Sequence, residues 1–448
     1  MKNKAMFLAS VLCLLASCAN PGATKRDHVV FYVWGDASEI ANYEKIARDF
    51  ETEMGFKVKV EPSTGSYYDN LNISFSSSSK APDIYFTEPG EFVGHVAADK
   101  VLDLAPYIEE KILDVKNAAN PSGKIELWDL NDAYRFNGNK IGEGSYHALI
   151  KDYSPDFVLW YNKSHIDEYN VEHGFSRGDA GFMEYPSSEV ALSWDEFLDM
   201  SAKLKKGSRY GTMLDRVPYK HVMEWVQMNG SSFWAEDGRH FNAEDPKLIE
   251  AFQFFTDLQI GDKASSPLVG PVGIGSGQKF ANGDLSFAFF GSYAYSTYGW
   301  DSLDFEFGIA PAPTPNGGSE LYHACSGMIA LAVNKDSTVK DEAVSFLNYY
   351  MTKGAEYMAK KGFNIPGNKA VAESDDFMYP ESSELAMVNQ YFLNLTSSTH
   401  PLQFHQEIPA LTIEDILGKH FSSYLSNPSS STVEDVLIAA GNEIAREL

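Results

Sequence analysis

The sequence predicts an α/β fold, because strand and helix patterns alternate along it from residue 28 onward. The first observation is an uninterrupted apolar run at residues 29–34 (VVFYVW), which suits a parallel strand buried on both faces. The second is a stripe of apolar side chains at three- and four-residue steps over residues 40–54, typical of an amphipathic helix. The third is the alternating segment 57–61 (KVKVE), a strand that completes a βαβ unit.

The ends of these elements carry matching signals. Ser38 is expected to be the N-cap of the first helix, and Gly55 lies where a C′ glycine belongs. A second helix is expected at residues 67–76, and a third strand at residues 82–86 (PDIYF). Ligands of open α/β sheets bind beyond the carboxyl ends of the strands, so the side chains that follow strands one and three are binding-site candidates: Trp34, Asp36, Thr87 and Glu88.

The same alternation continues through the rest of the chain. Ser193 and Glu196 form a capping box that opens a helix ending near residue 205. Trp160 and Trp194 fall on the faces of a strand and a helix and are predicted to be core residues. The other expected elements are strands at residues 157–161, 285–290, 308–311 and 328–333, and helices at residues 246–260, 339–351, 355–361 and 432–448.

The N-terminus has the pattern of an export signal. Lys2 and Lys4 precede an apolar run of about ten residues, which is too short to cross a bilayer comfortably. Residues 15–18 (LASC) resemble a bacterial lipobox, in which a cysteine is lipidated and becomes the new N-terminus. The resemblance implies a signal peptide at residues 1–17, followed by a lipidated Cys18 and a tether to residue 27. A soluble secretory signal with an incidental cysteine is the alternative.

The composition excludes several classes of protein. The chain has 448 residues and a formal net charge of −26, which becomes −28 once the two signal-peptide lysines are removed. This charge argues against a protein that binds nucleic acid or anionic lipid through a broad basic face. The 24 Tyr, 29 Phe and 7 Trp exclude a disordered polymer. Cys13 would leave with the signal and Cys18 would carry lipid, so Cys325 is expected to be a buried thiol without a disulfide.

Short motifs along nearly the whole mature chain resemble those of one family. They are residues 34–36 (WGD), 82–84 (PDI), 160–163 (WYNK), 193–197 (SWDEF), 280–284 (FANGD), 291–293 (GSY), 307–313 (FGIAPAP) and 362–366 (GFNIP), with a glycine at Gly327. In this order, and together with the lipobox, they are similar to the extracellular solute-binding proteins of ABC importers. The chain departs from the family pattern at Tyr293, where the family has Trp, and in the longer segment 168–192.

The resemblance implies a two-lobed α/β architecture, the periplasmic-binding-protein type II fold, in which hinge strands join the lobes around a central cleft. By position, lobe one would comprise residues 28–153 and 324–376, and lobe two residues 155–320 and 380–448. The chain would cross between the lobes near residues 153–154 and 320–325. Closure would trap a solute in the cleft, and the closed form would meet the subunits of an ABC permease in the membrane. No catalytic residue, cofactor or metal site is expected.

A mono- or oligosaccharide is the favoured ligand, and it needs flat aromatic platforms with hydrogen-bonding groups at their edges. The resemblance places seven residues at the cleft: Trp34, Asp36, Glu88, Trp225, Tyr293, Gly327 and Asn364. The chemistry of nearby residues adds five candidates: Thr87, Asn229, Trp234, Tyr295 and Trp300. The carboxylates of Asp36 and Glu88 would accept hydrogen bonds from hydroxyl groups, or would instead serve as helix N-terminal carboxylates.

Other ligands and activities stay open at this point. A polyamine would need several acidic groups around aromatic rings, iron would need paired tyrosines with a carboxylate or histidine, and a peptide is a further alternative. A glycosidase would need two carboxylates with separated pKa values, for which Asp36 and Glu88 are the nearest candidates. A surface adhesin that only reuses the fold is another class. Residues 400–407 hold metal-capable side chains, but Pro401 and Pro409 break their helical spacing. The glycine-rich residues 273–277 are expected to form a loop.

Overall fold

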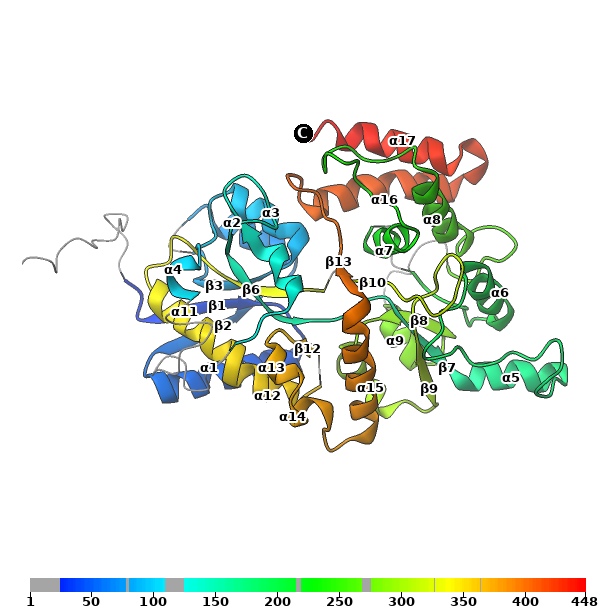
Figure 1. The fold of residues 1–448 in the computed structure, drawn as a ribbon, viewed down its shortest axis with the longest axis horizontal. Coiled ribbons are helices and arrows are strands. Elements are labelled where there is room, and N and C mark those ends of the chain that lie inside the picture. The colour runs from blue at the N-terminus through cyan, green and yellow to red at the C-terminus, as the bar shows by residue number, and fades with distance from the viewer. Residues whose placement is uncertain are drawn as a thin grey trace, which may run out of the picture.

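The computed structural model describes residues 25–77, 80–108, 125–214, 219–267, 275–325, 327–362 and 364–448. Within these ranges the chain forms two α/β lobes side by side, each built on its own sheet (Figure 1). The predicted signal peptide, Cys18 and the first part of the tether lie outside the described residues. In the ranges above, no helix has both the length and the apolar content needed to cross a membrane.

A mixed six-stranded sheet forms the centre of lobe one, in the strand order β12-β6-β11-β3-β1-β2. β1 pairs in parallel with both β2 and β3, which confirms the predicted βαβ start. β11 runs antiparallel to its neighbours β3 and β6. The strands are β1 (His28–Val33), β2 (Lys57–Pro62), β3 (Ile84–Thr87), β6 (Ala148–Tyr153), β11 (Ile329–Val333) and β12 (Ile365–Pro366).

Helices cover this sheet (Figure 1). They are α1 (Ala37–Met54), α2 (Tyr67–Ser74), α3 (Pro89–Ala97), α4 (Ala105–Tyr107), α11 (Lys340–Tyr349), α12 (Ala355–Ala359), α13 (Lys369–Ala372) and α14 (Asp375–Met378). A π-helical turn at Tyr350–Gly354 joins α11 to α12. A small hairpin of β4 (Arg135–Phe136) and β5 (Ser145–Tyr146) follows a 3-10 segment at Asp129–Tyr134.

The expected N-cap of α1 is wrong by two residues. Asp36 is the N-cap, and its carboxylate accepts the backbone N–H groups of Ser38 and Glu39 at 2.7 and 2.9 Å. The Glu39 side chain accepts the Asp36 N–H in return, at 3.0 Å, which completes a capping box. The two side chains together satisfy three backbone N–H donors at the start of the helix, and a cap at Ser38 would leave these bonds unmade. The expected C′ glycine, Gly55, is confirmed in the left-handed conformation, with φ of 74°.

Lobe two is built on a three-stranded antiparallel sheet in the order β8-β7-β9. Its strands are β7 (Val158–Asn162), β8 (Phe287–Phe290) and β9 (Phe307–Ala310). Its helices are α5 (Lys163–His173), α6 (Trp194–Leu204), α7 (Lys220–Met228), α8 (Pro246–Asp257), α9 (Ser276–Ala281), α10 (Ala294–Thr297), α16 (Ala410–Ser426) and α17 (Val433–Ile444). The predicted Ser193–Glu196 capping box is confirmed at the start of α6. Ser276 already begins α9, so the expected glycine-rich loop at residues 273–277 is partly helical, and its first two residues lie outside the described part.

The chain passes between the lobes where consecutive strands belong to different sheets. It leaves β6 of lobe one and enters β7 of lobe two through residues 154–157, and it returns to β11 after β10 (His323–Cys325). β10 pairs in parallel with β13 (Thr399–Pro401), which leads from α15 (Ser383–Asn394) toward α16. These segments lie at the centre of the molecule between the lobes (Figure 1).

The packing at this junction is continuous. The thiol of Cys325 is buried, as predicted, and donates to the carbonyl of Ser154 at 2.9 Å. Trp160 and Trp194 are buried, which confirms both as core residues. Trp160 packs on Trp300, with the ring centres 4.8 Å apart, and on Phe392 of α15, at 5.8 Å. Burial of these large rings stabilises the packing of α15 against the three-stranded sheet.

Candidate ligand-binding site

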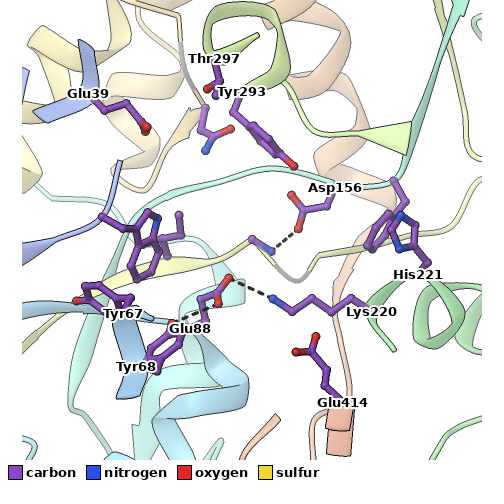
Figure 2. Close-up of a pocket in the computed structure, with 15 residues that line it drawn as sticks. Glu39, Tyr67, Tyr68, Glu88, Asp156, Lys220, His221, Tyr293, Thr297 and Glu414 are labelled. Carbon is purple, nitrogen blue, oxygen red and sulfur yellow. Dashed lines mark hydrogen bonds and ion pairs between the residues drawn. The ribbon is translucent and has the colours of Figure 1, made fainter. Parts of the chain in front are cut away.

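A cavity of about 730 Å³ lies between the two lobes (Figure 2). Lobe one contributes residues that follow its strands or lie on its first helices: Trp34, Glu39, Tyr67, Tyr68 and Glu88. Lobe two contributes Phe157, Lys220, His221, Tyr293, Thr297 and Glu414. Residues at the crossings and on nearby lobe-one strands complete the wall: Asp156, Gly327, Ile329 and Asn364.

Trp34 forms an aromatic part of the lobe-one wall. It directly follows β1, so the strand end itself places it at the cleft. Its indole meets the rings of Tyr67, Phe86 and Tyr68 with centroid distances of 4.5, 5.1 and 5.9 Å. All three contacts are edge-on, with interplanar angles of 62–86°, so none of these rings stacks parallel on the indole. Edge-on packing of this kind fixes the orientation of the indole before a ligand arrives.

Glu88 and Lys220 meet across the cleft (Figure 2). Glu88 is the N-cap residue of α3, yet its side chain makes no cap bond and is available to the cavity. It accepts the Tyr68 hydroxyl at 3.2 Å and faces the Lys220 amine at 3.5 Å. Because the two residues belong to different lobes, this ion pair joins the lobes across the cavity. Burial lowers the pKa of Lys220, but the nearby carboxylates, led by Glu88, outweigh that effect and leave the pKa raised.

The wall near the crossings is held by Asp156 and Gly327. The Asp156 carboxylate accepts the backbone N–H of Gly327, a bond that joins the two inter-lobe segments (Figure 2). A Cβ atom at Gly327 would lie 2.6 and 2.7 Å from the two Asp156 carboxylate oxygens, closer than any real Cβ contact. Only glycine therefore fits at this position without moving the carboxylate.

Asn364 is fixed by partners from both lobes. Its amide nitrogen donates to the Asp152 carboxylate at 3.3 Å, and its amide oxygen accepts the Ser292 hydroxyl at 3.2 Å. Asp152 in turn forms a buried ion pair with Lys151 on β6. Because both ends of the amide are held, Asn364 presents a defined orientation to the cavity.

Comparisons with known proteins identify the family to which this chain belongs. The family model for bacterial extracellular solute-binding proteins matches residues 36–357. This chain belongs to that family. It is therefore an extracytoplasmic solute-binding protein of an ABC transporter, with a small-molecule ligand and permease subunits as partners. A comparison with curated protein sequences gave no match.

Solved structures share the two-lobed fold of this solute-binding protein. An ABC substrate-binding protein from Listeria monocytogenes in complex with cycloalternan has 18% identity and a TM-score of 0.75, covering 94% of this chain and 98% of its own. Maltose-bound MalE3 of T. maritima has 18% identity and a TM-score of 0.71, with 94% and 100% covered. UgpB of Mycobacterium tuberculosis in complex with glycerophosphocholine has 16% identity and a TM-score of 0.73, with 94% and 98% covered. At such identities the likeness establishes the fold alone.

Five of the twelve predicted site residues line the interlobe cavity: Trp34, Glu88, Tyr293, Gly327 and Asn364. Three others lie near the cleft without lining it. The Asp36 carboxylate accepts backbone N–H groups as the N-cap of α1. Thr87 is buried, with its hydroxyl 3.1 Å from Nδ1 of His95, and Tyr295 donates to Glu384 of α15 at 2.8 Å. All three side chains were expected to line the cavity. The structure corrects this, because their polar groups bond to other parts of the protein.

The remaining four candidates lie elsewhere in lobe two. Trp225 is fully buried against Phe254 of α8, with the ring centres 4.7 Å apart. Trp300 is fully buried, and its indole N–H donates to the carbonyl of Gly277 at 3.2 Å. Asn229 turns away from the cleft and donates to α8, at Lys247 O and Glu250. Trp225 and Trp300 complete packing layers, so their large rings are core residues and do not face the cleft.

Trp234, the last of the four, lines a second cavity of about 420 Å³ between the lobes. This cavity is bounded by residues 401–406 of the hinge segment and by Ile141 and Gly142 of lobe one. The Trp234 indole N–H donates to the Gln403 carbonyl at 2.6 Å. Nearby, His405 accepts the backbone N–H groups of Glu407 and Ile408 through Nδ1, so it serves the loop at residues 400–407.

Sequence reasoning missed ten lining residues: Glu39, Tyr67, Tyr68, Asp156, Phe157, Lys220, His221, Thr297, Ile329 and Glu414. A signal existed for some of them. Asp156 and Phe157 directly precede β7, at a predicted crossing between lobes, where a cleft residue is expected. Glu414 had none, because it reaches the cavity from α16, far along the chain from every other lining residue of lobe two.

Proposed function

We propose that this solute-binding protein captures a mono- or oligosaccharide in the interlobe cavity and passes it to the permease subunits. The observation that carries the proposal is the combination of aromatic rings and carboxylates in one interlobe cavity. Trp34 and Tyr293 offer ring surfaces from the two lobes, and Glu88 offers carboxyl oxygens as hydrogen-bond acceptors. A sugar presents an apolar ring face surrounded by hydroxyl groups, which matches such a lining. The volume of about 730 Å³ suits a small ligand.

A polyamine is the second candidate, because the described lining holds four carboxylates and a single lysine: Glu39, Glu88, Asp156, Glu414 and Lys220. Protonated amines would find acceptors there with aromatic rings around them. Iron has weaker support. The Tyr67 and Tyr68 hydroxyls already donate to the Phe86 carbonyl and to Glu88, and the described residues contain no cluster of three or more His, Cys, Asp or Glu suited to a metal.

Thermal unfolding in the presence of candidate ligands tests the proposal. The panel comprises mono- and oligosaccharides, spermidine, short peptides and Fe(III). A ligand that binds only the folded protein raises the unfolding temperature in proportion to the logarithm of its concentration. We expect such a rise with at least one sugar. A response to spermidine or Fe(III) with none to any sugar would contradict the carbohydrate assignment.

The protein is further proposed to be anchored to the outer face of a bacterial membrane through lipid on Cys18. The described chain begins at Lys25, whose amine pairs with Glu342 of α11 at 2.8 Å. The next residue, Arg26, pairs with the buried Asp83 at 2.8 Å. The tether would therefore leave from lobe one. Metabolic labelling with palmitate should mark the wild-type protein, and Cys18→Ser should abolish both the label and sedimentation with membranes.

No hydrolysis of the bound sugar is proposed. Of the two carboxylates that a glycosidase would have used, Asp36 bonds the backbone of its own helix and does not line the cavity. An acid and base pair of the required kind is therefore not assembled from these residues. Incubation with an oligosaccharide that binds should release no reducing ends. Release at a steady rate would reinstate the enzyme.

A further inference from the structure

Helices α3 and α16 come from different lobes and contact each other (Figure 1). α3 belongs to lobe one, where Phe92 is buried in the core around the six-stranded sheet. α16 belongs to lobe two, where Ile413 and Leu417 join a separate core with α17 and α8. A contact between these helices therefore bridges the two lobes, and an opening that separates α3 from α16 would break it.

Gly90 lets the two helices approach closely, and Gly94 lies one turn further along α3. A Cβ atom at Gly90 would lie 2.5 Å from the Cβ of Ala410 and 3.0 Å from the ring of Phe404. Neither neighbour is the end of a flexible chain, so a larger residue at Gly90 would force the helices apart. At Gly94 a Cβ atom would lie 3.5 Å from Pro409, an ordinary van der Waals contact. The close approach is thus concentrated at the first of the two positions.

Glu91 lies between these glycines and reaches across to α16. Its carboxylate accepts the backbone N–H of Leu411, in the first turn of α16, at 3.1 Å. α16 begins after Pro409, which gives no side-chain cap, so lobe one supplies a cap that the helix itself lacks. Glu91 is only 5% exposed in this arrangement. One turn further along α16, Glu414 lines the ligand cavity near Lys220.

We propose that Glu91 is a positioning residue of the binding site, which caps α16 from the opposite lobe, latches the closed form and holds Glu414 at the cavity wall. The latch does not touch the ligand. It acts through the docking of one helix on another, and the glycine at position 90 makes that docking possible. Closure and ligand affinity then depend on a residue outside the cavity lining.

The contact between Glu91 and α16 makes the population of the closed form depend on pH. Burial raises the pKa of Glu91 to about 7, with Glu88 and Glu414 adding to the rise, and with the Leu411 N–H and Lys220 opposing it. In the open form the carboxyl would meet water and return toward its ordinary pKa of about 4.3. The closed form therefore binds the proton more tightly, and lowering the pH from 8 to 5.5 favours closure.

Several titratable or charged groups surround Glu91 in the described part of the chain. They are Glu88 and His95 on α3, Tyr68 on α2, Tyr134 beneath Phe92, Tyr219 and Lys220 at the start of α7, and Glu414 on α16. Burial lowers the pKa of His95 to about 3, so this ring stays neutral over the range of interest. Burial raises the pKa of Tyr68 and of Tyr219, so both phenols stay protonated.

Distances between spin labels in the ligand-free protein test the latch. Labels are attached to cysteines introduced at the exposed Glu51 of α1 and Glu434 of α17, in a full-length chain that carries Cys13→Ser and Cys18→Ser. The native Cys325 is buried and does not react. The pulsed-dipolar distance distribution then gives the populations of closed and open molecules. No ligand is needed, so a failure here is distinct from a failure of the sugar assignment.

Gly90→Ala and Gly94→Ala form a matched pair. Both substitutions replace a glycine of α3 by alanine, but only the first creates the clash with α16. We expect Gly90→Ala to lose the closed population and Gly94→Ala to keep it. Equal distributions for both variants and the wild type would overturn the proposal.

Two variants of Glu91 distinguish the effect of its hydrogen bond on closure from the effect of its protonation. Glu91→Gln keeps an acceptor oxygen and should stay closed. At pH 5.5, where the wild-type carboxyl is protonated in the closed form, Glu91→Ala should lower the closed-to-open ratio by about fivefold, the usual effect of a lost helix cap. In the wild type the ratio should rise roughly tenfold to thirtyfold between pH 8 and pH 5.5, and Glu91→Gln should remove this dependence. A wild-type ratio that is independent of pH, or a pH response unchanged in Glu91→Gln, would overturn the proton-linked latch.

Discussion

Replacement of Trp34 by alanine should weaken sugar binding without unfolding the protein. The indole is partly exposed at the cleft, and its ring contacts within the protein are edge-on, so a sugar can cover ring surface that the protein leaves open. Covering about 60 Å² of ring at about 25 cal/mol per Å² stabilises the complex by about 1.5 kcal/mol. Contacts specific to an aromatic face extend the expected range to about 1–3 kcal/mol, or a Kd raised about fivefold to 150-fold.

Isothermal titration calorimetry measures this change with the sugar that gives the largest thermal shift. Trp128→Ala is the matched control, because Trp128 is also a partly buried lobe-one indole, but its N–H donates to the Pro366 carbonyl at 3.0 Å and it does not line the cavity. Trp128→Ala should lower the unfolding temperature and leave the Kd unchanged. An unchanged Kd in Trp34→Ala, or an equal loss of affinity in both variants, would refute the reasoning.

Three further predictions follow from named contacts. Gly327→Ala should weaken binding about fivefold to 150-fold in calorimetry, because its Cβ would displace the Asp156 carboxylate at a cost of about 1–3 kcal/mol; an unchanged Kd would show that this carboxylate is free to move. Trp225→Ala should lower the free energy of unfolding by about 3–5 kcal/mol in urea denaturation, while the folded fraction binds sugar normally. A loss of affinity without a loss of stability would show instead that Trp225 contacts the ligand. Hydrogen bonds from Lys206 and Arg209 lower the pKa of the Glu168 carboxyl to about 2. The contribution of Glu168 to the stability of the fold is therefore present above its ordinary pKa and is lost as the pH falls toward 2. Glu168→Gln should therefore reduce the unfolding temperature at pH 7, and a difference from the wild type that persists at pH 2 would contradict this assignment.

The fold followed from local patterns, because the signals that define it are local. The apolar run of β1, the stripe of α1 and the capping box at Ser193 each depend on residues within a few positions of one another. The cap of α1 was misassigned because Asp36 and Ser38 are both good N-cap residues, and the reciprocal bond from Glu39 decides between them.

The site was predictable where a strand end places a residue, and not where tertiary packing does. Trp34 and Glu88 directly follow parallel strands, so the rule for open α/β sheets found them. Trp225 was misplaced because its burial depends on α8, whose Phe254 covers it, and no local pattern reports that contact. Glu414 was missed for the opposite reason, since α16 reaches the cleft only through its docking on α3.

A crystal structure of the protein with a sugar from the thermal screen tests the central claim most directly. The account predicts that the sugar lies in the interlobe cavity, with a ring face on Trp34 or Tyr293 and a hydroxyl donating to Glu88. A sugar bound in the second cavity beside Trp234, or on the outer surface with the interlobe cavity empty, would contradict it.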